Sequence, residues 1–191
     1  MNYLGIPRTP AVGLAVVGLG ASTGPLDFAV AVAFPAITAA FGLETSETRW
    51  VAIFYVLSYG SLMLAFGALG DRIGHLRVFR VGLILSTVSL IMGSLVPSYG
   101  WLLASRVVQG MGVALILSCG PALAIAQFDD TQRTRALSRY GVMAALAAVI
   151  APILGGQAIA VLGWQGVFWF RLPIVLLALL LLPLAEPPAA R

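Results

Sequence analysis

The sequence has 191 residues and a net charge of +4; 60% of its residues are hydrophobic and only 9% are charged. A soluble domain is about 45–50% apolar and about 25% charged, so this composition excludes an ordinary water-soluble fold and indicates a chain surrounded by lipid. There is no lysine, and the arginines lie between apolar blocks rather than in one patch, which favours a role in membrane topology over nucleic-acid binding. The single cysteine, Cys119, lies in an apolar segment, so we expect neither an intrachain disulfide nor a structural metal site.

Six apolar segments approach or exceed the roughly 20 helical residues that a bilayer core requires. They are residues 11–40, 50–69, 78–96, 102–126, 140–162 and 167–184. The first segment is longer than needed and contains Pro25 and Pro35, which predict a bend. The sequence therefore predicts an all-α membrane protein that forms a single six-helix bundle over residues 1–191.

The arginines are distributed unequally between the two sides of this bundle. If the N-terminus is inside, only Arg49, Arg106 and Arg171 lie near the outer helix ends, and the other eight of the eleven fall on the inner side. Because positively charged loops stay cytoplasmic, we expect both termini in the cytoplasm. The tryptophans agree, because aromatic rings favour the membrane interface and all four fall at the expected outer helix ends: Trp50, Trp101, Trp164 and Trp169.

The first span carries Asp27, the only acidic residue deep in any predicted span, within the segment LDFAVAVAFP at residues 26–35. A buried carboxylate that is balanced by a nearby arginine can exchange a proton near neutral pH. The alternative is a carboxylate without a function, reached by interfacial water at a helix break near Pro25. We favour a proton-exchanging role for Asp27.

The turn between the second and third spans reads GALGDRIGHLR over residues 67–77. Gly74 permits a tight turn, and Asp71 can face a helix N-terminus or a neighbouring arginine. An ordinary basic turn is the alternative to a functional loop here.

The fourth span contains Arg106, followed by Gln109, Gly110 and Gly112. An arginine inside an apolar span costs several kcal/mol unless it is paired or hydrated, which makes Arg106 a functional candidate. Gln109 lies three residues further on and therefore shares its helical face. The alternative is an arginine whose side chain reaches the outer interface.

Small residues recur four apart in the fifth span, in the rows Ala144–Ala148 and Ala147–Ala151–Gly155. Such rows allow the close backbone approach through which helices associate in lipid. The fifth span is therefore expected to contribute a helix–helix interface.

Together these segments resemble the signatures of the major facilitator superfamily, and in particular its fourteen-helix drug:proton antiporters. The turn at residues 67–77 resembles G-x-x-x-D-R-x-G-R-[RK], with His75 and Leu76 in place of the basic pair, and residues 106–112 resemble R-x-x-x-G-x-G. Residues 147–156 resemble g-x-x-x-G-P-x-x-G-G, with Ala151 in place of the glycine before the proline.

Two further segments extend the resemblance. Residues 26–35 resemble L-D-x-T-I-V-N-V-A-L-P, with Ala31 at the asparagine position when the prolines are aligned. Residues 163–173 resemble W-R-W-x-F-x-x-N-x-P, with Arg171 at the asparagine position. Arg171 could serve as an outer gate, a lipid-headgroup contact or a repellent of some substrates.

The resemblance implies one half-bundle of this superfamily and assigns roles to its motif residues. Proton coupling would depend on Asp27 and Arg106. The substrate cavity would include Asp27, Phe34, Arg106, Gln109 and Val113. A cytoplasmic latch would consist of Gly67, Asp71, Arg72, Gly74 and Arg77. The antiporter motif would form a dimer interface from Gly141, Ala144, Ala148, Ala151, Pro152, Gly155 and Gly156.

Members of the superfamily bind substrate between two six-helix bundles, so we expect a partner bundle for this one. The simplest partner is a second copy in a parallel homodimer, with the second and fifth spans at the interface. The expected function is proton-coupled export of small amphipathic, often cationic, compounds across a bacterial inner membrane. Half of a heteromeric transporter and a non-transporting scaffold or fragment are the alternatives. We expect no enzymatic activity and no cofactor, because the single histidine, His75, has no catalytic partners.

Overall fold

The computed structural model describes residues 9–185, and all regular secondary structure within that range is helical. Six of its helical segments are long and apolar enough to cross a membrane, as the composition predicts. The chain is therefore a multi-pass membrane protein with the architecture expected for a six-helix half-bundle.

The first span is interrupted near its middle. It consists of α1 (Pro10–Ala21), the 3₁₀ turn η1 (Pro25–Asp27), α2 (Phe28–Val32) and α3 (Phe34–Phe41). The bend predicted from the prolines is confirmed at η1, where the hydroxyls of two residues after α1 donate to the carbonyls of Leu19 (2.6 Å) and Gly20 (2.8 Å). Proline lacks the N–H that would continue the helical hydrogen bonds here, and hydroxyl bonds of this kind favour a bend.

The second and third spans form a hairpin with a tight turn. After the short helix α4 (Thr45–Thr48), α5 (Trp50–Ile73) runs the length of the bundle and α6 (His75–Ser94) returns. A single residue separates them, Gly74, whose φ of 98° suits glycine. The turn expected from the sequence at Gly74 is confirmed.

The remaining spans are α7 (Tyr99–Ile125), α8 (Asp130–Leu162) and a sixth span built from α9 (Gly166–Trp169), α10 (Leu172–Leu181) and η2 (Leu182–Ala185). Helix α8 begins ten residues before the apolar segment predicted at 140–162. Its first turns are polar and mostly exposed, so they are helical without being apolar, and a prediction based on hydrophobicity does not detect them.

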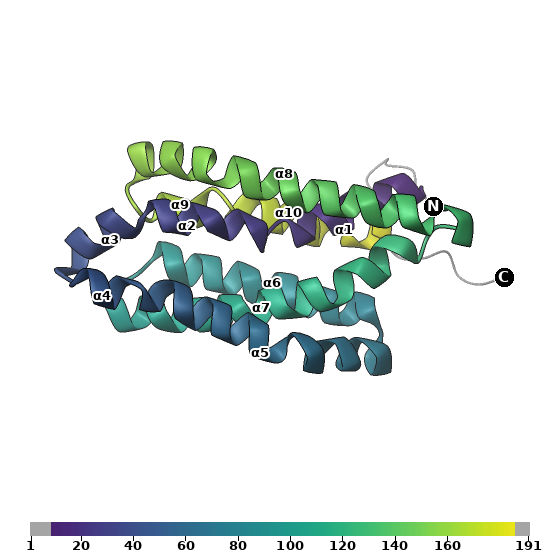
Figure 1. The fold of residues 1–191 in the computed structure, drawn as a ribbon, viewed down its shortest axis with the longest axis horizontal. Coiled ribbons are helices and arrows are strands. Elements are labelled where there is room, and N and C mark those ends of the chain that lie inside the picture. The colour runs from purple at the N-terminus through teal and green to yellow at the C-terminus, as the bar shows by residue number, and fades with distance from the viewer. Residues whose placement is uncertain (1–8, 186–191) are drawn as a thin grey trace.

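The helices form a flattened bundle, with α8 along one edge and α5 along the opposite edge (Figure 1). Between them lie α1, α2 and α10 on the side of α8, and α6 and α7 on the side of α5. The first and fourth spans are the most buried, while α5 and α8 are the least. These two edge helices therefore expose the largest apolar surfaces of the bundle.

Helix α7 approaches both of its neighbours at glycines. A Cβ on Gly112 would lie 2.8 Å from the backbone nitrogen of Ser86 on α6, and a Cβ on Gly110 would lie 2.6 Å from the carbonyl oxygen of Tyr55 on α5. Real Cβ atoms do not come this close to backbone, so both positions require glycine. This close packing fixes the position of Arg106, one turn earlier on the same helix.

One tryptophan departs from the expected interfacial pattern. Trp50, Trp101 and Trp169 are exposed, whereas Trp164 is only 8% exposed. Its ring packs edge-on against Phe41 at the end of the first span, with 5.6 Å between centroids. The interpretation of Trp164 as an interface anchor is therefore wrong, because its ring is packed inside the end of the bundle opposite the α5–α6 turn.

Candidate functional site

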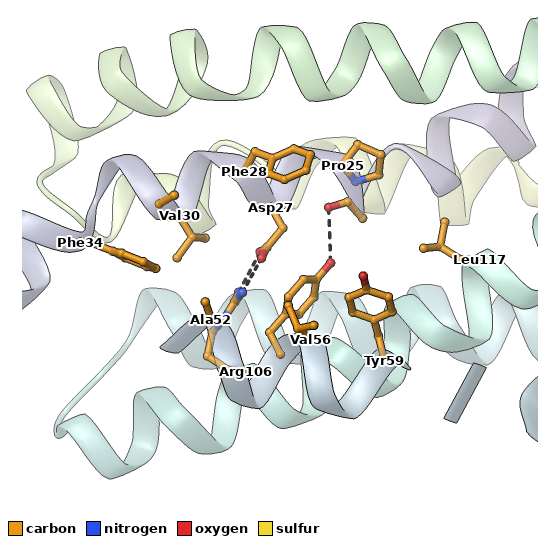
Figure 2. Close-up of a pocket in the computed structure, with 13 residues that line it drawn as sticks. Pro25, Asp27, Phe28, Val30, Phe34, Ala52, Val56, Tyr59, Arg106 and Leu117 are labelled. Atoms are coloured by element: carbon orange, nitrogen blue, oxygen red, sulfur yellow. Dashed lines mark hydrogen bonds and ion pairs between the residues drawn. The ribbon is translucent and has the colours of Figure 1, made fainter. Parts of the chain in front are cut away.

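The site is centred on Asp27, the last residue of η1, where the first span is interrupted. Its side chain is buried and points from the first span toward α7 (Figure 2). The break lies between α1 and α2, both of which lie well inside the ends of the bundle in Figure 1. Asp27 therefore needs partners from the other spans.

Arg106 of α7 is the first partner, and its guanidinium meets the carboxylate of Asp27 side on. Nη1 of Arg106 donates a 2.8 Å hydrogen bond to Oδ1 of Asp27, and Nη2 donates to Oδ2. The Nε donates to the carbonyl oxygen of Val51 at 3.0 Å, and the guanidinium lies 4.4 Å from the centroid of the Tyr55 ring. The paired geometry and the stacked ring hold Arg106 in one orientation.

Gln109 joins the same cluster from one turn further along α7. Its Nε2 donates to Asp27 Oδ1 at 3.2 Å, and its Oε1 accepts a hydrogen bond from Arg106. The shared helical face predicted from the spacing of Arg106 and Gln109 is confirmed. Gln109 therefore orients both members of the ion pair.

Arg171, which caps the start of α10, is a second guanidinium in this cluster. Its Nη1 donates to Asp27 Oδ1 at 2.8 Å, its Nη2 donates to the carbonyl oxygen of Thr23 at 3.0 Å, and its side chain is fully buried. The suggestion that Arg171 contacts a lipid headgroup is therefore wrong. One signal could have located it, since a buried arginine needs an acidic partner and Asp27 is the only acid deep in a span.

The cluster contains more positive than negative charge. Two guanidiniums, Arg106 and Arg171, share the single carboxylate of Asp27, which gives a formal surplus of one positive charge. The Nε of Arg171 is buried and has no hydrogen-bond partner among the described residues. The site therefore has both a charge surplus and a donor surplus.

A cavity of about 340 Å³ lies beside the cluster, between the first span, α5 and α7 (Figure 2). Of the residues expected to line it, Asp27, Phe34 and Arg106 do so. Gln109 and Val113 are not among its lining residues and are almost fully buried. Val113 packs toward Gly24, where a Cβ would lie 3.3 Å from its Cγ1.

Most of the cavity wall is apolar or aromatic. The residues that sequence reasoning did not anticipate lie beside the break in the first span, along one face of α5 and, for the last of them, on α7: Gly24, Pro25, Phe28, Val30, Ala31, Ala52, Tyr55, Val56, Tyr59 and Leu117. The spacing of four between Tyr55 and Tyr59 places both rings on one face of α5, and that spacing was a detectable signal. Such a wall suits a ligand with an apolar body.

Comparison with known proteins agrees with this arrangement of six spans. The profile of the Major Facilitator Superfamily matches residues 11–191. This chain belongs to the Major Facilitator Superfamily.

Several transporters of the superfamily are similar to this chain. An uncharacterized MFS-type transporter of Mycobacterium tuberculosis is 33% identical over 80% of this chain and 26% of its own length. A riboflavin transporter of Clostridioides difficile is 27% identical over 88% of this chain and 37% of its own length. A methylenomycin A resistance protein of Bacillus subtilis is 30% identical over 87% of this chain and 36% of its own length. The chain thus spans about a quarter to two fifths of the length of these relatives, which are transport or resistance proteins rather than enzymes.

The superfamily's loop signature lies at the α5–α6 turn. Asp71 Oδ1 lies 3.3 Å from Nε2 of His75, which occupies a position where the signature has a basic residue. Arg72 and Arg77 are exposed at the same end of the bundle, and Gly74 makes the turn. Gly67, one turn before Asp71, is half-buried and faces α7. A Cβ on Gly67 would lie 4.0 Å from the Cβ of Ser118.

The segment of α8 that resembles an antiporter signature is divided between two faces. Ala151 and Gly155 are buried against the first span, where a Cβ on Gly155 would lie 2.7 Å from Ala29 Cβ. The assignment of these two residues to a dimer interface is therefore corrected, because both are buried within the chain and Gly155 packs α8 onto α2. The other five residues of the proposed interface are exposed or half-buried: Gly141, Ala144, Ala148, Pro152 and Gly156.

Proposed function

We propose that this bundle forms one half of a proton-coupled exporter of small amphipathic compounds, completed by a second six-helix bundle. Membership of a transporter family and similarity to a methylenomycin A resistance protein support export. The observation that carries the proposal is the buried Asp27–Arg106 pair on the wall of an apolar cavity, because an ionisable group retained at such cost within a span is normally functional.

Proton coupling is assigned to Asp27. Its carboxylate has contacts from α7 and α10, so adding a proton weakens hydrogen bonds to two other spans at once. A change in protonation can therefore be converted into a change in helix packing around the cavity. Arg106 is the partner that lines the cavity and senses both the proton and the substrate.

A second copy in parallel orientation is the simplest partner bundle. Support comes from α5 and α8, the least buried spans, whose exposed side chains include Leu64 (88% exposed) and Val149 (69% exposed). Two-fold pairing through α5 and α8 would enclose the cavity, which α5 borders, between two bundles. A heteromeric partner bundle with the same fold is the alternative; lipid alone would cover these faces in a scaffold.

The proposed orientation places both termini and the α5–α6 turn in the cytoplasm of a bacterium, with the chain in the inner membrane. The loop residues Gly67, Asp71, Arg72, Gly74 and Arg77 would then latch the two bundles together on the cytoplasmic side. The packing of α1 against η2 supports this in part, because it brings the two ends of the described chain to the end of the bundle that carries this turn (Figure 1).

The test is accumulation of the neutral dye Nile red in pump-deficient cells that express this chain. We expect lower accumulation than in empty cells, with the difference abolished by a protonophore and by Asp27→Asn at an equal protein level in the membrane. Asp27→Glu, which keeps a carboxylate, should retain part of the effect. The matched control is Asp130→Asn, which removes an exposed carboxylate at the start of α8 and should change nothing.

Two results would contradict parts of the proposal. Unchanged accumulation with well-inserted protein would rule out transport by copies of this chain alone and favour a heteromeric partner. Full export by the Asp27→Asn variant would show that Asp27 is not the proton-coupling residue.

A further inference from the structure

The charge surplus of the buried cluster is not balanced elsewhere on the cavity wall. Asp27 and Arg106 are the only charged residues among the described residues that line the cavity, and Arg171, which is not a lining residue, donates to Asp27 at 2.8 Å. Each guanidinium contributes one formal positive charge, against the single negative charge of the carboxylate. A ligand in the cavity therefore meets a wall whose formal charge is positive.

The hydrogen-bonding capacity of the cluster points the same way. A guanidinium has five N–H donors, of which four on Arg106 and two on Arg171 have partners in the structure. The carboxylate of Asp27 already accepts four hydrogen bonds. Among the described residues, this leaves one guanidinium N–H without a partner on Arg106, which lines the cavity, and three on Arg171, which is buried outside the lining. The hydrogen bond that the cluster can offer a ligand is therefore a donor from Arg106, which suits an additional acceptor.

An aromatic surface that would otherwise attract cations is also occupied. Organic cations bind over the faces of aromatic rings, and Tyr55 is a cavity-lining residue of this kind. The guanidinium of Arg106 already lies over the Tyr55 ring, 4.4 Å from its centroid. That face of Tyr55 is therefore not offered to a cationic ligand.

We propose that the cavity selects amphipathic organic anions over organic cations, and that Arg171 is the residue that sets this preference. The inference rests on the proposed function and names its substrate class. The apolar body of the ligand would lie among Phe28, Phe34 and Val56, with its anionic group toward Arg106. The expectation of cationic substrates was based on the buried carboxylate of Asp27 and the apolar cavity walls, and the second arginine reverses the balance of charge.

The experiment is equilibrium binding of a shape-matched pair of ions, tetraphenylborate and tetraphenylphosphonium, to the purified full chain. We expect tetraphenylborate to bind more tightly. Arg171→Gln should reduce the ratio of the two affinities about tenfold, because it removes one charge close to the cavity in a medium of low effective dielectric constant. Arg171→Lys keeps the charge and should largely keep the ratio.

A second pair of variants leaves the buried cluster intact. Val56 lines the cavity and is 50% exposed, so its replacement does not depend on repacking of the core. Val56→Glu should weaken tetraphenylborate binding and strengthen tetraphenylphosphonium binding, while Val56→Gln should change the ratio little. If Val56→Glu affects neither ion, the probes bind elsewhere and the assignment to this cavity fails.

Equal or tighter binding of the cation by the wild-type chain overturns the proposal, as does an unchanged ratio in a folded Arg171→Gln variant. Binding does not require transport, so the two proposals can fail separately. Anion preference without Nile red export would contradict transport by copies of this chain alone and leave this inference standing. Nile red export without anion preference would contradict this inference alone.

Discussion

The carboxylate of Asp27 accepts a 2.8 Å hydrogen bond from Arg171, although 144 residues separate the two in the chain. This contact joins the break in the first span to the start of α10, and Arg106 joins the same carboxylate to α7. One acidic side chain thus connects three spans. Because it neutralises one of two buried arginines, the stability of the bundle and the charge of the cavity depend on the same group.

Removal of Asp27 is therefore expected to destabilise the bundle more than removal of Arg171. Asp27→Asn leaves two buried guanidiniums without a counter-charge, and breaking a buried pair in this way costs about 3–5 kcal/mol. Arg171→Gln leaves a one-to-one pair between Asp27 and Arg106, so its cost should be smaller. Thermal unfolding of purified protein in detergent should give the highest midpoint for the wild type, a lower one for Arg171→Gln and the lowest for Asp27→Asn.

The double variant Asp27→Asn/Arg171→Gln provides the control for that order. It leaves only Arg106 unpaired, so the two effects should not add, and the double variant should be no less stable than Asp27→Asn alone. A strictly additive loss would show that Asp27 and Arg171 act on stability independently. A lower midpoint for Arg171→Gln than for Asp27→Asn would contradict the account of the cluster.

The sequence identifies Asp27 and Arg106 because charged residues are rare in its apolar spans, and any that occur demand an explanation. It does not pair Arg171 with Asp27, because no helical spacing relates residues on the first and sixth spans. The family pattern also offers no guide at this position, since it has an asparagine where this chain has Arg171. Charge alone indicates that a buried Arg171 needs an acidic partner, but only the fold shows that its side chain reaches Asp27.

The six spans are predictable because lipid imposes length and apolarity on each helix. Which face of a helix meets its neighbours is harder to predict when every face is apolar. Ala151 and Gly155 show this, since a row of small residues looks the same whether it packs inside the chain or against a partner. Val113 was expected to line the cavity but is packed inside the bundle, whereas Leu117, one turn further along α7, does line it.

Close packing of α7 predicts a strong difference between two glycine-to-alanine substitutions. Gly112→Ala would place a methyl group against the backbone of α6, and overpacking of this kind costs about 1–3 kcal/mol. Gly60→Ala on α5 meets nothing within 4 Å and changes helix propensity in the same way. Gly112→Ala should lower the thermal midpoint by several degrees, while Gly60→Ala should leave it unchanged or raise it. Equal midpoints would contradict the α6–α7 contact.

Labelling of introduced cysteines tests the proposed orientation. The single native cysteine, Cys119, is buried, so Cys119→Ala provides a background with little perturbation. Ser46 before α5 and Gln132 at the start of α8 are both exposed, at opposite ends of the bundle. In intact cells an impermeant maleimide should label Ser46→Cys, and Gln132→Cys should react only after the cells are opened. The reverse pattern would place the termini outside.

Cross-linking tests the proposed parallel dimer through α5 and α8. Leu64 lies 14 residues from the start of α5 and Val149 lies 13 residues from the end of α8, which places the two at similar depths in the membrane. In the Cys119→Ala background, the double variant Leu64→Cys/Val149→Cys should form a disulfide-linked dimer when oxidised in membranes, because a parallel pair brings these helices of different copies together. Leu180→Cys, exposed at comparable depth on the sixth span, is the matched control and should stay monomeric. Equal cross-linking of both variants would indicate random collision, and the absence of a link in the double variant would contradict this interface.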